Sequence, residues 1–183
     1  MLNEQLLNPQ SIVVVGGSDN TSKPGGKVLE NILHDGYDGR LYVLNPGHTV
    51  VQGVPSFAEV QDLPDDIDLA IVAVSASLTV EVADKLARLR NTRAFIVISA
   101  GFSEDGPEGE TLEQELKNIV DSVDGALIGP NCIGILTPSF SGVFTSPVPR
   151  LDPKGCDFVS GSGSTAVFIL ESALPKGLTF SSL

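Results

Sequence analysis

Five short apolar runs between Ser11 and Ile128 alternate with stretches of helical periodicity. Each run is rich in Val, Ile or Leu and ends near small or turn-forming residues, which is typical of buried strands in a parallel sheet. This alternation predicts an α/β fold, a doubly wound parallel sheet covered by helices. The predicted strands are Ser11–Val15, Leu41–Leu44, Leu69–Val74, Ala94–Ile98 and Ala126–Ile128, and the predicted helices are Lys27–His34, Thr79–Leu89 and one that starts after Pro107.

The composition and the periodicity of the sequence change between Leu136 and Lys154. This segment contains four prolines and no strand or helix period, which indicates a crossing segment or linker. A second alternation follows, with predicted strands at Asp157–Ser160 and Leu178–Phe180 around a predicted helix at Thr165–Ala173. We therefore expect residues 1–145 to form one domain, and residues 146–183 to form a linker and the truncated start of a second α/β domain.

Composition excludes several classes of partner. The chain has 183 residues and a formal net charge of −12, which argues against nucleic acid and anionic membranes. No apolar run approaches the roughly 18 residues of a membrane span, and the first residues do not resemble a secretory signal. Two cysteines make neither a disulfide framework nor a zinc site. We expect a cytoplasmic protein without a metal.

The loop after the first strand is the main candidate site. Glycines there allow the backbone to approach a ligand closely, and the helix that follows offers free N–H groups to a phosphate. Lys23 and Lys27 are the nearest basic residues. The sequence therefore predicts an anion-binding loop, with the candidate residues Gly16, Gly17, Ser18, Lys23, Pro24, Gly25, Gly26 and Lys27.

The pattern disfavours NAD as the anionic ligand. A dinucleotide fingerprint needs G-x-G-x-x-G and a carboxylate at the end of the second strand. Here Gly16 and Gly17 are adjacent, and the second strand ends at Asn45. A carboxylate at that position would also repel a ribose that carries a 3′-phosphate, as the ribose of coenzyme A does.

The remaining strand ends carry small or polar residues. Ligands of open α/β sheets bind at the carboxyl ends of the strands, and small residues there suit a thin, amide-bearing chain such as pantetheine. These segments are Val74-Ser75, Ser99-Ala100-Gly101 and Gly129-Pro130-Asn131-Cys132.

Several short motifs occur in a characteristic order. They are Asn8-Pro9-Gln10-Ser11-Ile12, Gly16-Gly17-Ser18, Leu44-Asn45-Pro46, Ile71–Val74, Ile98–Phe102 and Gly129–Gly134. With this set the sequence resembles the Rossmann-like coenzyme A-binding domain of the ADP-forming acetyl-CoA and acyl-CoA synthetases, relatives of the succinyl-CoA synthetase α subunit. The resemblance covers Leu6 to Gly134 and resumes at Phe158–Gly163, where Val159–Gly163 looks like the family's V-S-Q-S-G at the start of a flavodoxin-like second domain.

The resemblance implies roles for these positions. The Gly16–Lys27 loop would hold the nucleotide phosphates, Asn45 and Pro46 would lie near the adenosine, and Pro130-Asn131-Cys132 would lie near the thiol. Val74, Ser75 and Ser99–Gly101 would flank the pantetheine. The family makes an acyl phosphate through a phosphorylated histidine of the second domain, expected past Leu183, and an ATP-grasp domain or β-type subunit supplies the nucleotide site. A homo- or hetero-oligomer is consistent with this scheme.

The sequence departs from the family pattern at several positions. Gly47 and then His48 follow Asn-Pro where lysine is common, Ser75 replaces a proline, and Gly161 replaces a glutamine. We keep His48 as a candidate phosphate contact. His34 is expected to close a helix, where a cation suits the dipole. Cys132 is expected to pack rather than react, and the acidic residues from Glu104 to Glu110 to form a solvated helix start.

Three functions are consistent with this sequence. The first is the coenzyme A-binding portion of an NDP-forming acyl-CoA synthetase, an acid–thiol ligase in which this chain alone is catalytically silent. The second is a non-catalytic coenzyme A-binding or regulatory module, for instance one attached to an acetyltransferase domain. The third and weakest is a nicotinamide-dependent oxidoreductase domain.

Overall fold

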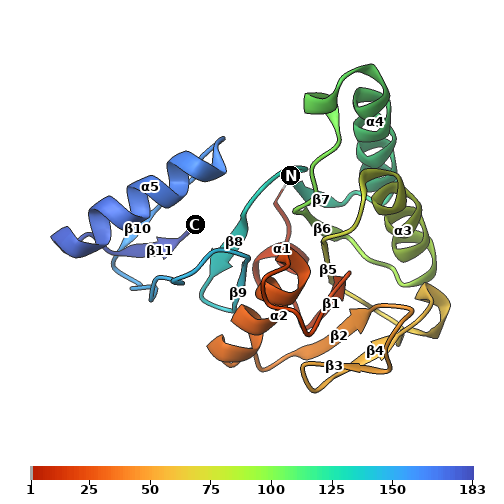
Figure 1. The fold of residues 1–183 in the computed structure, drawn as a ribbon, viewed down its shortest axis with the longest axis horizontal. Helices are drawn as coiled ribbons and strands as arrows, with labels where there is room; N and C mark the ends of the chain where they lie inside the picture. The colour runs from red at the N-terminus through yellow and green to blue at the C-terminus, as the bar shows by residue number, and fades with distance from the viewer. Residues whose placement is uncertain (1) are drawn as a thin grey trace.

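A seven-stranded sheet in the order β3-β4-β2-β1-β5-β6-β7 forms the centre of the molecule (Figure 1). The computed structural model describes residues 2–183. Every neighbouring pair in this sheet is parallel except the antiparallel hairpin β3–β4 at one edge. The strands are β1 (Ser11–Val15), β2 (Arg40–Leu44), β3 (Val50–Val51), β4 (Val54–Phe57), β5 (Leu69–Val72), β6 (Ala94–Val97) and β7 (Ala126–Ile128).

Helices cover both faces of the sheet. Successive side chains of a strand point to opposite faces, and those of the central strands are apolar on both, so each face needs a covering layer. Ile12 and Val14 of β1 pack in the core that α2 (Pro24–Asp35) and the short α1 (Glu4–Leu7) cover. Val13 and Val15 pack in the core under α3 (Ala76–Leu89) and α4 (Pro107–Ser122). Two 3₁₀ turns, η1 (Val60–Asp62) and η2 (Ser103–Asp105), lie in the connections.

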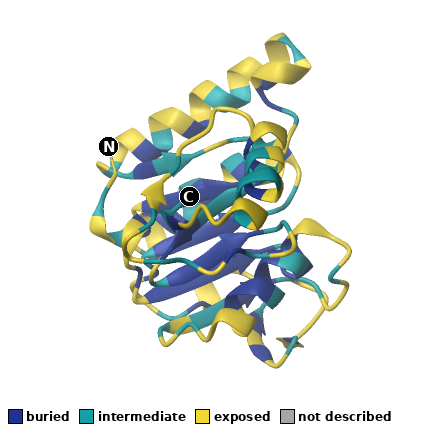
Figure 2. Cartoon of the chain, turned by 90° about the vertical axis from the view of Figure 1, so that its left-hand side faces the viewer, coloured by how far each residue is buried: buried dark blue, intermediate teal, exposed yellow. Residues whose placement is uncertain are grey.

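Buried residues concentrate in the strands, while each long helix of the central unit has one buried and one exposed side (Figure 2). β1, β5 and β6 are buried along their whole length, as expected for strands with helices on both faces. No helix among residues 2–183 is long and apolar enough to cross a membrane.

The sequence-based assignment is confirmed for five of the seven strands of the central sheet, whereas the hairpin β3–β4 was not predicted. The five predicted strands correspond to β1, β2, β5, β6 and β7, with ends that differ by no more than two residues. α2 begins at Pro24 rather than at Lys27, so Gly25 and Gly26 lie inside its first turn. Proline at the first helical position explains this start, because its fixed φ suits the helix and its missing N–H is not needed there.

The prediction that Leu136–Lys154 lacks regular structure is wrong. β8 (Gly134–Thr137) and β9 (Phe140–Val143) form an antiparallel hairpin whose turn contains Pro138. The Phe140 side chain is fully buried in the α2 core. Asn31 of α2 donates from its Nδ2 to the carbonyl oxygens of Val143 and Thr145, at 2.7 and 3.0 Å. The hairpin thus covers α2, a tertiary contact that the proline content concealed.

The last residues form a small unit beside β8. β10 (Cys156–Asp157) pairs in parallel with β11 (Phe180–Ser182), and α5 (Gly163–Ala173) and η3 (Leu174–Lys176) lie between them in sequence. The predicted helix is confirmed, whereas the two predicted strands are displaced from Asp157–Ser160 and Leu178–Phe180. Leu183 and Leu136 exchange both backbone hydrogen bonds, at 2.7 and 2.9 Å, which ties this unit to β8.

Candidate functional site

The predicted site residues gather along the rim formed by the carboxyl ends of the parallel strands. The chain runs from β1 to β2 on one side, whereas β5 pairs with β1 on the other. Such a switch in strand order is where open α/β sheets bind ligands. From β2 to β7 the rim crosses five strands, about 19 Å at the usual strand spacing. It therefore has room for a long, extended ligand.

The loop after β1 packs tightly against α2, and glycines make this possible. Gly16 has φ +80°, and a Cβ there would lie 2.7 Å from the carbonyl oxygen of Ala73. A Cβ on Gly25 would lie 2.2 Å from the oxygen of Gly16, and one on Gly26 would lie 2.2 Å from the oxygen of Asn20. The predicted need for glycine in this loop therefore has a steric cause.

Short polar side chains hold the same loop. The Ser18 hydroxyl accepts a hydrogen bond from the Asn20 backbone N–H at 3.1 Å, and Asn20 Oδ1 accepts from the Ser22 N–H at 2.9 Å. Within residues 2–183 no side chain caps the N-terminus of α2. Its first N–H groups have no acceptor within the helix and so are suited to an anion.

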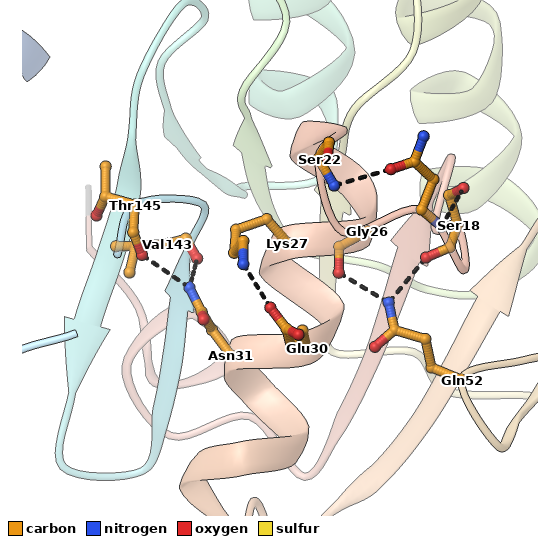
Figure 3. Close-up of polar contacts among 10 residues, drawn as sticks. Ser18, Ser22, Gly26, Lys27, Glu30, Asn31, Gln52, Val143 and Thr145 are labelled. Carbon is orange, nitrogen blue, oxygen red and sulfur yellow. Dashed lines mark hydrogen bonds and ion pairs between the residues drawn. The ribbon is translucent and has the colours of Figure 1, made fainter. Parts of the chain in front are cut away.

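The two lysines of this segment have different surroundings. The Lys27 ammonium lies 2.5 Å from the Glu30 carboxylate on α2 (Figure 3). Lys23 is exposed at the position that precedes the helix, in an extended conformation. Of the two predicted phosphate ligands, Lys23 is therefore the one whose charge is not already paired in the described structure.

The turn after β2 contacts the glycine loop through Asn45. Its Nδ2 donates to the Gly17 carbonyl oxygen at 2.9 Å, and its Oδ1 accepts from the Gly47 N–H at 2.9 Å. Pro46 and His48 are exposed and line a depression of about 410 Å³ together with residues of β3 and β4. Asn45 thus shapes the loop, while His48 offers a polar side chain at the outer end of the rim.

The ends of β5 and β6 continue the rim. Ser75 precedes α3, and its exposed hydroxyl does not cap that helix. The Gly101 N–H donates to the Glu104 carboxylate at 2.7 Å. Hydrogen bonds from the backbone N–H of Glu104 itself and from that of Gly101 lower the pKa of this carboxyl group. The sequence predicted only that Glu104 belongs to a solvated acidic run. In the structure its carboxylate also fixes the loop that contains Ser99, Ala100 and Gly101.

The end of β7 carries the predicted thiol end of the site. The Asn131 N–H donates to the Ser99 carbonyl oxygen at 3.0 Å, which brings this loop beside that of β6. Asn131 is exposed and has φ +54°. The Cys132 thiol donates to the Val97 carbonyl oxygen at 3.3 Å, and burial raises its pKa. This contact agrees with the expectation that Cys132 packs.

A cavity of about 430 Å³ joins this loop to the last part of the chain. Asn131 and Cys132 line it on one side, and Phe158, Val159 and Ser160 line it on the other. Residues of α1, β8, α5 and the end of β11 also line it. The sequence motif at Val159–Gly163 is therefore brought next to the predicted thiol end.

The structure also reveals a site residue that the sequence did not indicate. Gln52, in the turn between β3 and β4, donates from its Nε2 to the carbonyl oxygens of Ser18 and Gly26, each at 2.8 Å (Figure 3). No motif marks this glutamine, because the contact spans more than 25 residues of sequence. Among residues 2–183, no group of three or more His, Cys, Asp and Glu side chains is placed to hold a metal ion.

Comparison with known proteins shows what the chain as a whole is similar to. Residues 10–138 match the model of a family described as "CoA binding domain". The chain is 32% identical over 181 residues to an ADP-forming acetate–CoA ligase of Archaeoglobus fulgidus, and 29% identical over 185 residues to an ADP-forming 4-hydroxybutyrate–CoA ligase of Nitrosopumilus maritimus. The two matches include 97% and 100% of this chain but only 26% of each relative. The chain therefore spans about a quarter of the length of these relatives.

A solved structure has the same fold over nearly the whole chain. The dinucleotide-forming acetyl-coenzyme A synthetase 1 of Ca. Korarchaeum cryptofilum, in complex with phosphate and ADP, superposes with a TM-score of 0.88 at 30% sequence identity. The match covers 98% of this chain and 38% of that one. The likeness therefore includes the unit formed by β10, α5 and β11 as well as the central sheet.

Proposed function

The chain belongs to the CoA binding domain family, and on that premise we propose that its rim binds coenzyme A for an NDP-forming acyl-CoA synthetase. The reaction would join a carboxylate to coenzyme A, with a nucleoside triphosphate converted to the diphosphate and phosphate. The observation that carries this proposal is the continuous rim from the Gly16 loop to Asn131, which ends at a cavity shared with Val159 and Ser160.

The phosphates of coenzyme A would bind at the Gly16–Gly26 end of the rim. Close approach of the backbone, uncapped N–H groups of α2 and the exposed Lys23 ammonium all favour an anion there. Pro46 and His48 would lie near the adenosine. The net charge of −12 does not oppose this, because backbone N–H groups hold phosphates locally.

The pantetheine would follow the ends of β5 and β6 towards Asn131. Small residues at Ser75 and Ser99–Gly101 leave space for a thin chain, and an exposed hydroxyl or amide can pair with its amide groups. The thiol would reach the cavity at Asn131 and Cys132. We assign no catalytic residue to this chain: the Cys132 thiol is bonded to Val97, and His34 lies in the last turn of α2, at the helix end remote from the glycine loop.

Residues 146–183 are proposed as a linker and the start of a second domain. The segment Val159–Gly163 leads into α5, which begins at Gly163. The Ser162 hydroxyl caps this helix by accepting a hydrogen bond from the Thr165 N–H. The phosphorylated histidine would belong to that second domain beyond Leu183, and an ATP-grasp domain or subunit would supply the nucleotide site. A regulatory module would bind coenzyme A but would not require a second domain beside the thiol end.

Calorimetric titration tests the proposed ligand. The protein should bind coenzyme A more tightly than dephospho-CoA, and NAD weakly or not at all. Tight NAD binding without a response to coenzyme A would overturn the proposal. In the complete protein, formation of acyl-CoA from a carboxylic acid, coenzyme A and a nucleoside triphosphate separates the ligase from a purely regulatory module, which would bind coenzyme A without turnover.

A further inference from the structure

Gln52 occupies a backbone position that does not favour glutamine. Val51 pairs with Val54, so Gln52 and Gly53 form a two-residue hairpin turn. Their φ angles are +48° and +82°, both left-handed. Turns of this kind favour Asn-Gly or Gly-Gly, because residues other than Gly, Asn and Asp are disfavoured at positive φ. An unfavoured residue in such a conformation points to a role for its side chain.

The side chain of Gln52 joins the glycine loop to the helix that follows it. The two Nε2 hydrogens have separate acceptors, the Ser18 carbonyl oxygen in the loop and the Gly26 carbonyl oxygen in the first turn of α2, each at 2.8 Å (Figure 3). Gln52 is half-buried, which shields these bonds from exchange with water. The donor capacity of the amide is therefore fully used on the candidate phosphate site.

The backbone of Gln52 makes a third contact with the loop. Its N–H donates to Asp19 Oδ1 at 2.7 Å. Asp19 is the one carboxylate between Gly16 and Lys27, and a free carboxylate there would oppose a bound phosphate. The bond to Gln52 holds this oxygen against the β3–β4 turn.

We propose that Gln52 is a positioning residue that holds the Gly16–Gly26 loop in its phosphate-binding conformation. This inference rests on the proposed binding of coenzyme A. Gln52 itself does not touch the ligand in this account. Its amide fixes the carbonyl oxygens of Ser18 and Gly26, so that the N–H groups of the same segment need no reordering when the phosphates bind.

The variant Gln52→Asn separates this role from a role in the turn. Asparagine suits the left-handed backbone at least as well as glutamine, so folding should be preserved. Its side chain is one methylene shorter and cannot reach the two carbonyl oxygens. The matched control is Gln10→Asn, since Gln10 lies just before β1, at the amino end of the strand and so opposite the rim. Among the described residues its side chain makes one hydrogen bond, to the Asn8 carbonyl oxygen.

Titration calorimetry and amide hydrogen exchange on the wild-type and variant proteins provide the test. We expect Gln52→Asn to raise the Kd of coenzyme A and of dephospho-CoA by the same factor, about tenfold or 1.4 kcal/mol. Exchange should accelerate from Ser18 to Ser22, and the melting temperature should stay close to that of the wild type. Equal factors for the two ligands would identify an effect at the shared diphosphate rather than at the 3′-phosphate.

The possible failures are distinguishable. A wild-type protein that does not bind coenzyme A contradicts the proposed function itself. Wild-type binding that Gln52→Asn leaves unchanged overturns the role of Gln52 while the proposed function stands. An equal loss of affinity in Gln10→Asn, or a loss accompanied by a large drop in melting temperature, also overturns it, because the effect would then come from general destabilisation.

Discussion

The amide of Asn45 donates a hydrogen bond to the carbonyl oxygen of Gly17 across 2.9 Å and so connects the turn after β2 to the loop after β1. The oxygen of the same side chain, Oδ1, accepts from the Gly47 N–H. Both polar atoms of Asn45 are thus engaged in shaping the proposed phosphate site. A nicotinamide dinucleotide fold places a carboxylate at this position to bind a ribose, and a carboxylate could not make the bond to Gly17.

Asn45→Asp should therefore weaken coenzyme A binding. The carboxylate loses the hydrogen bond to Gly17 and adds a negative charge beside the proposed phosphates, which together should raise the Kd at least about tenfold. Titration calorimetry checks this, with Asn118→Asp on the outer surface of α4 as the control for added charge. Equal Kd values for Asn45→Asp and the wild type would contradict the placement of phosphates near Asn45.

Gly25→Ala should destabilise the fold and impair the site. The new Cβ would lie 2.2 Å from the Gly16 carbonyl oxygen, so either α2 or the loop must move. We expect a loss of about 1–3 kcal/mol in the free energy of unfolding, typical of forced overpacking, and weaker ligand binding. Gly161→Ala is the control, because its Cβ would meet no atom within 4 Å. Denaturant unfolding measures both variants, and equal stability of the two would contradict the steric need for glycine at position 25.

Lys23→Ala and Lys27→Ala should differ in their effects. Lys23 carries an exposed ammonium next to the α2 N-terminus, so its removal should weaken the binding of coenzyme A by about 1–3 kcal/mol. Lys27 already pairs with Glu30, and its removal should cost less. Titrations at low and at moderate salt compare the two variants, since a lost phosphate contact also reduces the salt dependence of binding. An unchanged Kd for Lys23→Ala removes this residue from the site.

Cys132 should resist alkylation. Burial raises the pKa of its thiol, so less thiolate is present at a given pH, and the thiolate is the reacting form. The Cys156 thiol is exposed. Iodoacetamide at pH 8, followed by mass spectrometry, should label Cys156 at least about tenfold faster than Cys132. Faster labelling of Cys132 would indicate an activated thiol and reopen a catalytic role for it.

Five strands of the central sheet and its three long helices could be predicted because their signals are local. Apolar runs such as Ser11–Val15 and stop signals such as Gly36 act within a few residues, and the observed elements follow them. The hairpin β8–β9 could not be predicted in this way, since it depends on Asn31 and the α2 core, more than 100 residues away in sequence. Its proline belongs to the turn and misled the local interpretation.

The candidate site, too, could be predicted from the sequence only in part. Glycines and strand ends marked the segments of the rim, and the structure brings the loops of Gly16, Ser99 and Asn131 to one edge of the sheet. Gln52 could not be predicted, because it holds the Gly16 loop through bonds to residues more than 25 positions away. Glu104 lies only three residues from Gly101, but the sequence does not distinguish a solvated carboxylate from one that accepts a backbone hydrogen bond. Lys27 and Glu30 are three residues apart on one helix, a spacing at which side chains can pair, and the structure shows that they do.

The most direct test is a crystal structure of the protein with coenzyme A. We expect the diphosphate to lie against the N–H groups between Gly16 and Gly26, the adenosine towards His48, and the thiol at the cavity lined by Asn131 and Ser160. Coenzyme A bound elsewhere on the protein, with the rim unoccupied, would contradict it.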